Sequence, residues 1–186
     1  MELKELYEHT KGRMEKTIRS LHGEYDSIRA GRANAKVLDR IEAEYYGTMT
    51  PITQMAGISN QDARTLIIQP WDRTALNPIC KAIQASDLGI NPQNDGTVIR
   101  LSFPVPTEER RKQLAKEVSK KAEEAKVAIR QIRRDSIEKV KNMKKAGDIT
   151  EDDQSDGEER VQKITDDFIK QIDKIAEDKT AEIMEL

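Results

Sequence analysis

Side chains able to do covalent or metal chemistry are few in this sequence and lie far apart. The chain has one cysteine, Cys80, and two histidines, His9 and His22. A zinc site needs clustered Cys or His ligands, and nucleophilic catalysis needs a nucleophile beside a base. The sequence offers neither arrangement, and its nine glycines form no phosphate-binding loop. We therefore predict no catalytic residue, no metal site and no cofactor.

Two features allow both a chemical and a structural interpretation. The acidic run Glu151–Asp153 carries the oxygen ligands of a cation site, but acids at this position also stabilise a helix N-terminus, and we favour the second interpretation. Cys80 stands among apolar residues, so we interpret it as a small buried side chain rather than a reactive thiol. A single thiol forms no internal disulfide, which favours an intracellular setting.

The pattern that does indicate a function is a basic stripe along a helix predicted from Thr107. Residues 107–146 contain 14 basic and 7 acidic residues. If Val118 occupies heptad position d, positions b, e and f between residues 112 and 144 hold nine cations and one acid, Glu123. The nine cations are Lys112, Lys116, Lys120, Lys126, Arg130, Arg133, Arg134, Lys141 and Lys144. A stripe of this kind is typical of nucleic-acid binding through phosphates.

Ion pairing within the protein is the alternative explanation of the stripe. Residues 147–186 contain 14 acidic and 5 basic residues, so a third helix could neutralise some cations. Position e borders a neighbouring helix, which makes Lys126 and Arg133 candidates for interhelical pairs. Arg130 and Arg134 point outward and are less easily explained in this way. Aromatic residues make up only 4% of the chain, which favours contact with structured RNA over base stacking.

Three long helices are needed to position this stripe. Apolar residues recur three and four apart between Leu3 and Ile28, and again on either side of Gly147. Thr107 and Thr150 are candidate N-caps, the latter with Asp153 in a capping box. The short connection at Gly147 predicts that the second and third helices are antiparallel. No apolar run approaches transmembrane length, and the charged N-terminus does not resemble a signal peptide, so we expect a cytoplasmic protein.

The segment between the first two helices has a different composition. All six prolines lie within residues 51–106. Apolar and β-branched runs predict three strands and a helix, at Ile41–Tyr46, Thr65–Gln69, Thr97–Phe103 and Thr74–Ser86. We predict an α+β protein with two domains: a long antiparallel three-helix bundle of residues 1–30 and 105–186, and an inserted β/α/β domain of residues 31–104. The two connections form a predicted hinge, comprising Ala30 and Gly31, and Pro104, Val105 and Pro106.

Several short motifs resemble signatures of the ribosome recycling factor family. They occur in order along the whole chain and include Arg29-Ala30-Gly31-Arg32-Ala33, Glu44-Tyr45-Tyr46-Gly47, Gln69-Pro70-Trp71-Asp72, Ser86–Pro92, Thr107–Lys112 and Arg130–Asp135. The resemblance implies an L-shaped monomer that binds the 23S rRNA of the large ribosomal subunit. It further implies that, with GTP-bound elongation factor G, the protein splits post-termination ribosomes. The GTPase activity then belongs to elongation factor G.

The resemblance also assigns candidate rRNA-binding residues. It implies contacts at Arg111, Arg130 and Arg133, and at Arg29 and Arg32 beside the hinge, while the basic stripe adds Arg134. Two other function classes stay open at this point. One is a non-ribosomal helical scaffold that binds another protein, and the other is a carboxylate hydrolase in the α/β segment.

Overall fold

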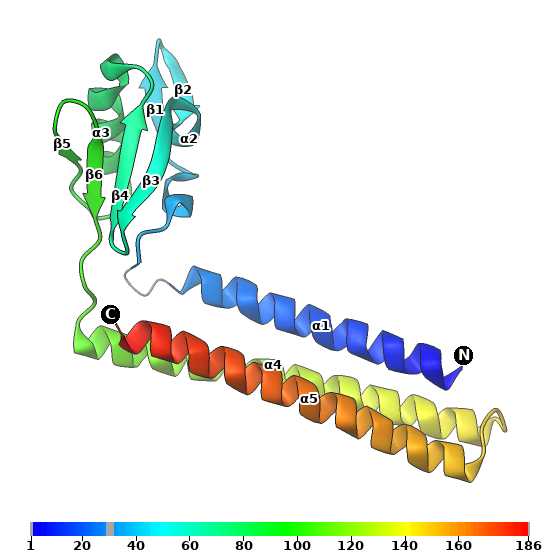
Figure 1. Ribbon diagram of the computed structural model, residues 1–186. Coiled ribbons are helices and arrows are strands. Elements are labelled where there is room, and N and C mark those ends of the chain that lie inside the picture. Colours follow the sequence, from blue (N-terminus) through cyan, green and yellow to red (C-terminus); the bar gives the residue numbers. More distant parts are fainter. Residues whose placement is uncertain (1, 29–31, 186) are drawn as a thin grey trace. The chain divides into compact units, whose positions relative to one another are not determined.

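The computed structural model describes residues 2–28 and 32–185, and its contacts divide the chain into two compact units. One unit comprises Met1–Ala30 with Thr107–Leu186, and the other comprises Gly31–Pro106. Figure 1 shows that the first unit holds long helices and the second a small arrangement of strands and short helices. The expected α+β fold, with a helical bundle and a small β-containing unit, is confirmed.

The bundle consists of α1 (Leu3–Ser27), α4 (Glu108–Lys145) and α5 (Glu151–Met184). Contacts between α4 and α5 run in opposite directions along the two helices: Lys126 pairs with Asp173, and Val140 lies beside Gly157. A Cβ at Gly157 would lie 3.2 Å from Cγ1 of Val140, so glycine permits this close approach. The two helices are therefore antiparallel, as predicted. No helix in the described ranges is apolar over a membrane-spanning length.

Both predicted N-caps are present. The Thr107 hydroxyl accepts a hydrogen bond from the Arg110 N–H at 3.2 Å at the start of α4. At the start of α5, Thr150 and Asp153 form a reciprocal capping box, with bonds of 2.9 and 3.1 Å between each side chain and the other residue's N–H. The hydrogen bonds that the N–H and the hydroxyl of Thr150 donate to the Asp153 carboxylate lower its pKa. The acidic run Glu151–Asp153 therefore belongs to the first turn of α5, where the helix dipole favours negative charge.

The apolar stripe of α4 follows a heptad repeat and then drifts from it. Buried residues on α4 include Val118, Ala122, Ala125, Ile129 and Ile132 in this repeat. Farther along, Ser136 still follows the repeat, but the next buried residue is Val140 at position e, and Met143 at position a is only half-buried. An α-helix has 3.6 residues per turn rather than 3.5, so the buried stripe of a nearly straight helix moves around its surface.

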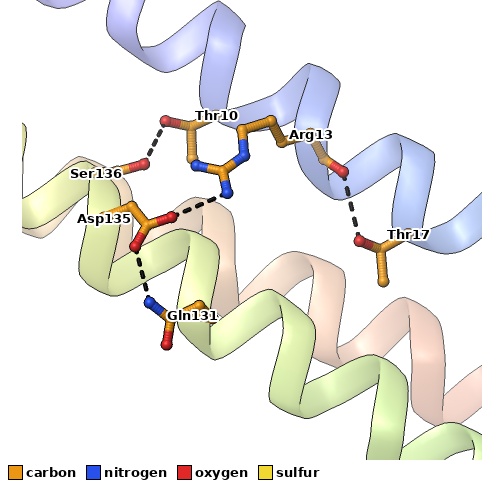
Figure 2. Close-up of polar contacts among 6 residues, drawn as sticks. All are labelled: Thr10, Arg13, Thr17, Gln131, Asp135 and Ser136. Carbon is orange, nitrogen blue, oxygen red and sulfur yellow. Dashed lines mark hydrogen bonds and ion pairs between the residues drawn. The ribbon is translucent and has the colours of Figure 1, made fainter.

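A polar layer crosses the apolar core between α1 and α4 (Figure 2). The hydroxyls of Thr10 and Ser136 are buried and lie 2.8 Å apart. Beside them, Nη2 of Arg13 donates to the Asp135 carboxylate at 2.9 Å, and Nε2 of Gln131 donates to its other oxygen at 2.8 Å. Buried polar groups are costly unless they are paired, so this layer favours one axial register between the two helices.

The small unit contains a hairpin and a separate sheet. The hairpin joins β1 (Glu42–Tyr45) to β2 (Thr48–Pro51). The antiparallel sheet has the order β3-β4-β6-β5 and comprises β3 (Ala56–Asp62), β4 (Thr65–Pro70), β5 (Gln93–Asn94) and β6 (Ile99–Ser102). Short helical segments complete the unit: η1 (Ala35–Leu38), α2 (Ile52–Met55), η2 (Arg73–Ala75) and α3 (Leu76–Ala85).

One apolar core holds this unit together. Leu66 and Ile68 of β4, Leu101 of β6 and Ile83 of α3 are all fully buried in it. Cys80 on α3 is half-buried against the same core, and burial raises the pKa of its thiol. The raised pKa agrees with the interpretation of Cys80 as an unreactive thiol, because a reactive cysteine needs a lowered pKa, but the side chain is half-buried and not buried as predicted.

We expect the stability of the bundle to fall at alkaline pH because of Tyr25 on α1. Its buried hydroxyl donates to the Val118 carbonyl at 2.8 Å, and burial raises its pKa to about 12. An unfolded tyrosine ionises near about pH 10, so the unfolded state loses this proton first and stability falls as pH rises from about 10 to 12. Tyr25→Phe should cost about 1 kcal/mol at pH 9.

Urea unfolding of wild type and Tyr25→Phe at pH 9 and pH 11 measures this effect. The stability difference between the two proteins should shrink at the higher pH, because only wild type loses the contribution of the buried hydroxyl. A difference that stays constant would mean that Tyr25 does not resist ionisation in the folded state.

Candidate nucleic-acid interface

Most of the cations in the predicted stripe are exposed on α4 and uncompensated. Arg130 and Arg134 are both exposed, one helical turn apart. Six of the nine cations form no hydrogen bond or ion pair within residues 2–28 and 32–185. These six are Lys116, Lys120, Arg130, Arg134, Lys141 and Lys144. Because no carboxylate is bound to them, their charge is available to an external polyanion.

Ion pairing explains two of the remaining cations. Lys112 bonds Glu108 along the helix at 2.7 Å. Lys126 bonds Asp173 of α5 at 2.5 Å and Glu123 at 3.2 Å, and the Asp173 contact is the main cause of its raised pKa. The alternative explanation of the stripe, ion pairing between helices, is therefore confirmed for Lys126. Its side chain is only 15% exposed, and we leave it out of the candidate interface.

Arg133 is the third of the remaining cations, and it forms a hydrogen bond with a neutral partner. It is half-buried, and its Nη1 donates to the Gln162 side-chain oxygen of α5 at 2.8 Å. An amide oxygen accepts a hydrogen bond without cancelling the charge of the guanidinium. Arg133 thus contacts the neighbouring helix, as its e position predicted, but not as an ion pair.

The nearest acid on α4 is turned away from the arginine cluster. Asp135 follows Arg134 in sequence, but its carboxylate bonds Arg13 of α1 and Gln131 (Figure 2). These two hydrogen bonds hold the pKa of Asp135 below its usual value. The other acids of the helix at heptad position c also lie beyond the stripe: Glu117, Glu124 and Glu138. The helix therefore has a cationic flank, formed by positions b, e and f, which borders α5. These acids lie nearer α1, on the side where Lys121 bonds Glu24 of α1 at 2.8 Å.

The structure brings together only part of the predicted set of arginines. Arg130, Arg133 and Arg134 lie on adjacent turns, whereas Arg111 is about 28 Å away along α4 by the helical rise. Nη1 of Arg111 donates to the carbonyl of Met184 at 3.4 Å, near the end of α5. Arg32 is exposed and belongs to the other compact unit.

The predicted hinge is described only in part. Arg29, Ala30 and Gly31 lie outside the described residues. Residues 104–106 have no regular secondary structure, and Val105 is 47% exposed.

Two exposed aromatic residues of the small unit were not among the predicted site residues. The side chains of Tyr46 and Trp71 are 81% and 73% exposed. The hydroxyls of Tyr45 and Tyr46 donate to the Asp72 carboxylate at 3.2 and 3.3 Å. Two motifs that are distant in sequence therefore meet at Asp72. The sequence signal that could have singled out these two residues is that they are large aromatic residues in a chain that has few of them.

An exposed cationic flank along a helix is the electrostatic pattern expected of a protein that binds nucleic acid. Comparison with known proteins then identifies the family. Residues 21–184 match the family model described as Ribosome recycling factor, and the chain belongs to this family of non-enzymatic translation factors.

The similarity extends over the whole chain. It is 56% identical over 183 residues to a ribosome-recycling factor of Listeria monocytogenes, covering 98% of this chain and 99% of that one. This chain is also 52% identical over 184 residues to a ribosome-recycling factor of Clostridium perfringens, covering 99% of this chain and 100% of that one.

Two solved structures show the same relationship. A solution structure of the ribosome recycling factor matches with a TM-score of 0.71 and 36% identity, covering 100% of this chain and 99% of the other. A second match is the T. thermophilus ribosome recycling factor, from a structure that places it with E. coli elongation factor G on the E. coli post-termination complex. This match has a TM-score of 0.60 and 45% identity, covering 98% and 99%.

Proposed function

We propose that this protein acts with elongation factor G and GTP on the post-termination ribosome, binding the large subunit and splitting the two subunits for reuse. Its membership of the ribosome recycling factor family along the whole chain supports this function. The observation that carries the binding step is the uncompensated pair Arg130 and Arg134 on α4. We place this activity in the cytoplasm and attribute it to a monomer.

The basic flank of α4 is the proposed contact with 23S rRNA. Guanidinium groups form two-pronged, charge-assisted hydrogen bonds with phosphate oxygens, and Arg130, Arg133 and Arg134 lie close enough to engage neighbouring phosphates. The helix offers no aromatic platform for stacking, so recognition depends on the phosphate positions of a folded RNA. Arg111, Arg29 and Arg32 are proposed as further contacts.

The two domains have different proposed roles. Residues 1–30 and 105–186 bind the large subunit, and the inserted residues 31–104 transmit force from elongation factor G. The chain passes between the domains twice, at Ala30 and Gly31 and again at Pro104, Val105 and Pro106, and we propose these connections as the hinge. GTP hydrolysis belongs to elongation factor G, and this protein supplies no catalytic residue.

Light scattering of post-termination ribosomes tests the proposed function. Adding this protein, elongation factor G and GTP should lower the scattered intensity as 70S particles separate, and leaving out any one component should prevent the decrease. An unchanged signal beside an active control factor would reject the proposal. Absence of any ribosome binding would instead favour the helical scaffold.

A further inference from the structure

Two cations at e positions of α4 bond across to α5, and their partners differ in charge. Lys126 bonds the carboxylate of Asp173 at 2.5 Å, whereas Arg133 bonds the amide of Gln162 at 2.8 Å. A carboxylate fixes a cation and also neutralises it, while an amide fixes it and leaves the charge in place. Arg133 is therefore both oriented and charged.

Gln162 is itself held in one orientation. Its Nε2 donates to Oδ1 of Asp166 at 2.8 Å, one turn farther along α5, which leaves its side-chain oxygen to accept from Arg133. The Nε of Arg133 is buried and forms no hydrogen bond in the described part of the chain. Nη2 also forms no bond there. The hydrogen bonds from Gln162 to Asp166 and from Arg133 to Gln162 thus hold Nη1 of the guanidinium, while Nη2 stays free to bind a phosphate.

We propose that Gln162 is a positioning residue for RNA binding: it orients Arg133 toward rRNA phosphates and, being neutral, preserves the charge that binds them. This inference rests on the proposed function. It assigns a role in binding to a residue of α5, outside the basic stripe of α4. Ordering Arg133 before binding reduces the entropy lost when the side chain meets a phosphate.

Gln162→Glu separates this role from a purely structural one. The new carboxylate would form an ion pair with Arg133, as Asp173 does with Lys126, so a purely structural role predicts unchanged binding. The positioning role predicts weaker binding in a protein that stays folded. We expect affinity for purified large ribosomal subunits to fall about fivefold at about 0.1 M salt, and the salt dependence to become shallower by the equivalent of about one phosphate.

Gln171→Glu is the matched control. It makes the same charge change on α5, but Gln171 is exposed and lies nine residues away, on the opposite side of the helix. The affinity of the Gln171→Glu variant for large subunits should stay within about twofold of wild type. Gln162→Leu removes the anchor without adding charge and should weaken binding about two- to threefold, which keeps the test valid if the glutamate variant folds poorly.

The experiment measures the affinity of the full chain for purified large subunits, with Arg133→Ala and the double variant Arg133→Ala/Gln162→Glu included. Gln162→Glu should have no further effect once Arg133 is removed, because the two residues act together. An equal loss in both backgrounds, or Gln162→Glu binding as tightly as Gln171→Glu, would overturn the inference and leave the proposed function standing. Failure of wild type to bind would reject the proposed function itself.

Discussion

Replacing Arg130 and Arg134 together by glutamate is expected to weaken binding to large ribosomal subunits about 100-fold at about 0.1 M salt. Each change removes a charge-assisted contact and adds repulsion, at about 1.4 kcal/mol per site, and every 1.4 kcal/mol is a factor of ten. Both side chains are exposed and form no bond within the described residues. Thermal stability should therefore change little. Equilibrium binding and circular dichroism on the same samples measure the two quantities.

Lys163→Glu/Lys170→Glu is the control for this pair. It makes the same change in net charge at two exposed residues of α5 that also lack a bond in the described ranges. If both double variants weaken binding equally, net charge governs the affinity and the flank of α4 has no special role. If only the arginine variant unfolds, Arg130 and Arg134 are structural residues and the interface is wrongly placed.

Replacing residues 32–105 by a ten-residue glycine and serine linker should preserve subunit binding and abolish splitting. The end of α1 lies beside α4: Tyr25 bonds the Val118 carbonyl, and Ile28 shares a core with Leu114. From Leu114 back to Thr107 the helix rises about 10 Å, and ten extended residues span up to about 33 Å. The linker can therefore close the bundle without strain.

The expected result is separation of two activities. Affinity for large subunits should stay within about tenfold of wild type, because the cationic flank is intact, while light scattering should show no splitting with elongation factor G and GTP. Splitting at the normal rate would show that the inserted residues transmit no force. Loss of binding in a folded bundle would show that the main contacts lie in the inserted domain.

The helices were predictable because their signals are local. Helix caps and breaks depend on residues that are close in sequence, here Thr107, Thr150 and Gly147. The spacing of the apolar residues directly indicates the period of the helix. The strands were less predictable. β2, β3 and β5 were missed. β3 is an edge strand with few buried residues, so its sequence at Ser59 and Asn60 lacks the alternation that marks a half-buried strand.

The charge pattern of the site was predictable, but its internal partners were not. Heptad position correctly indicated that Lys126 and Arg133 face a neighbouring helix. It could not show that one meets Asp173 and the other Gln162, because that depends on the axial register of α5 against α4. The same limit applies to Asp135, whose orientation toward Arg13 follows from the packing of α1. Sequence spacing determines the face of one helix, while tertiary packing determines which residue lies opposite.

The salt dependence of large-subunit affinity tests most directly whether α4 binds rRNA through phosphates. Affinity should fall linearly with salt concentration on logarithmic axes, with a slope of about 0.7–0.9 per phosphate bound. For Arg130→Ala/Arg134→Ala the slope should be shallower than that of wild type by about 1.5, since the variant no longer neutralises two of the phosphates. Slopes that are equal for the two proteins would contradict the account.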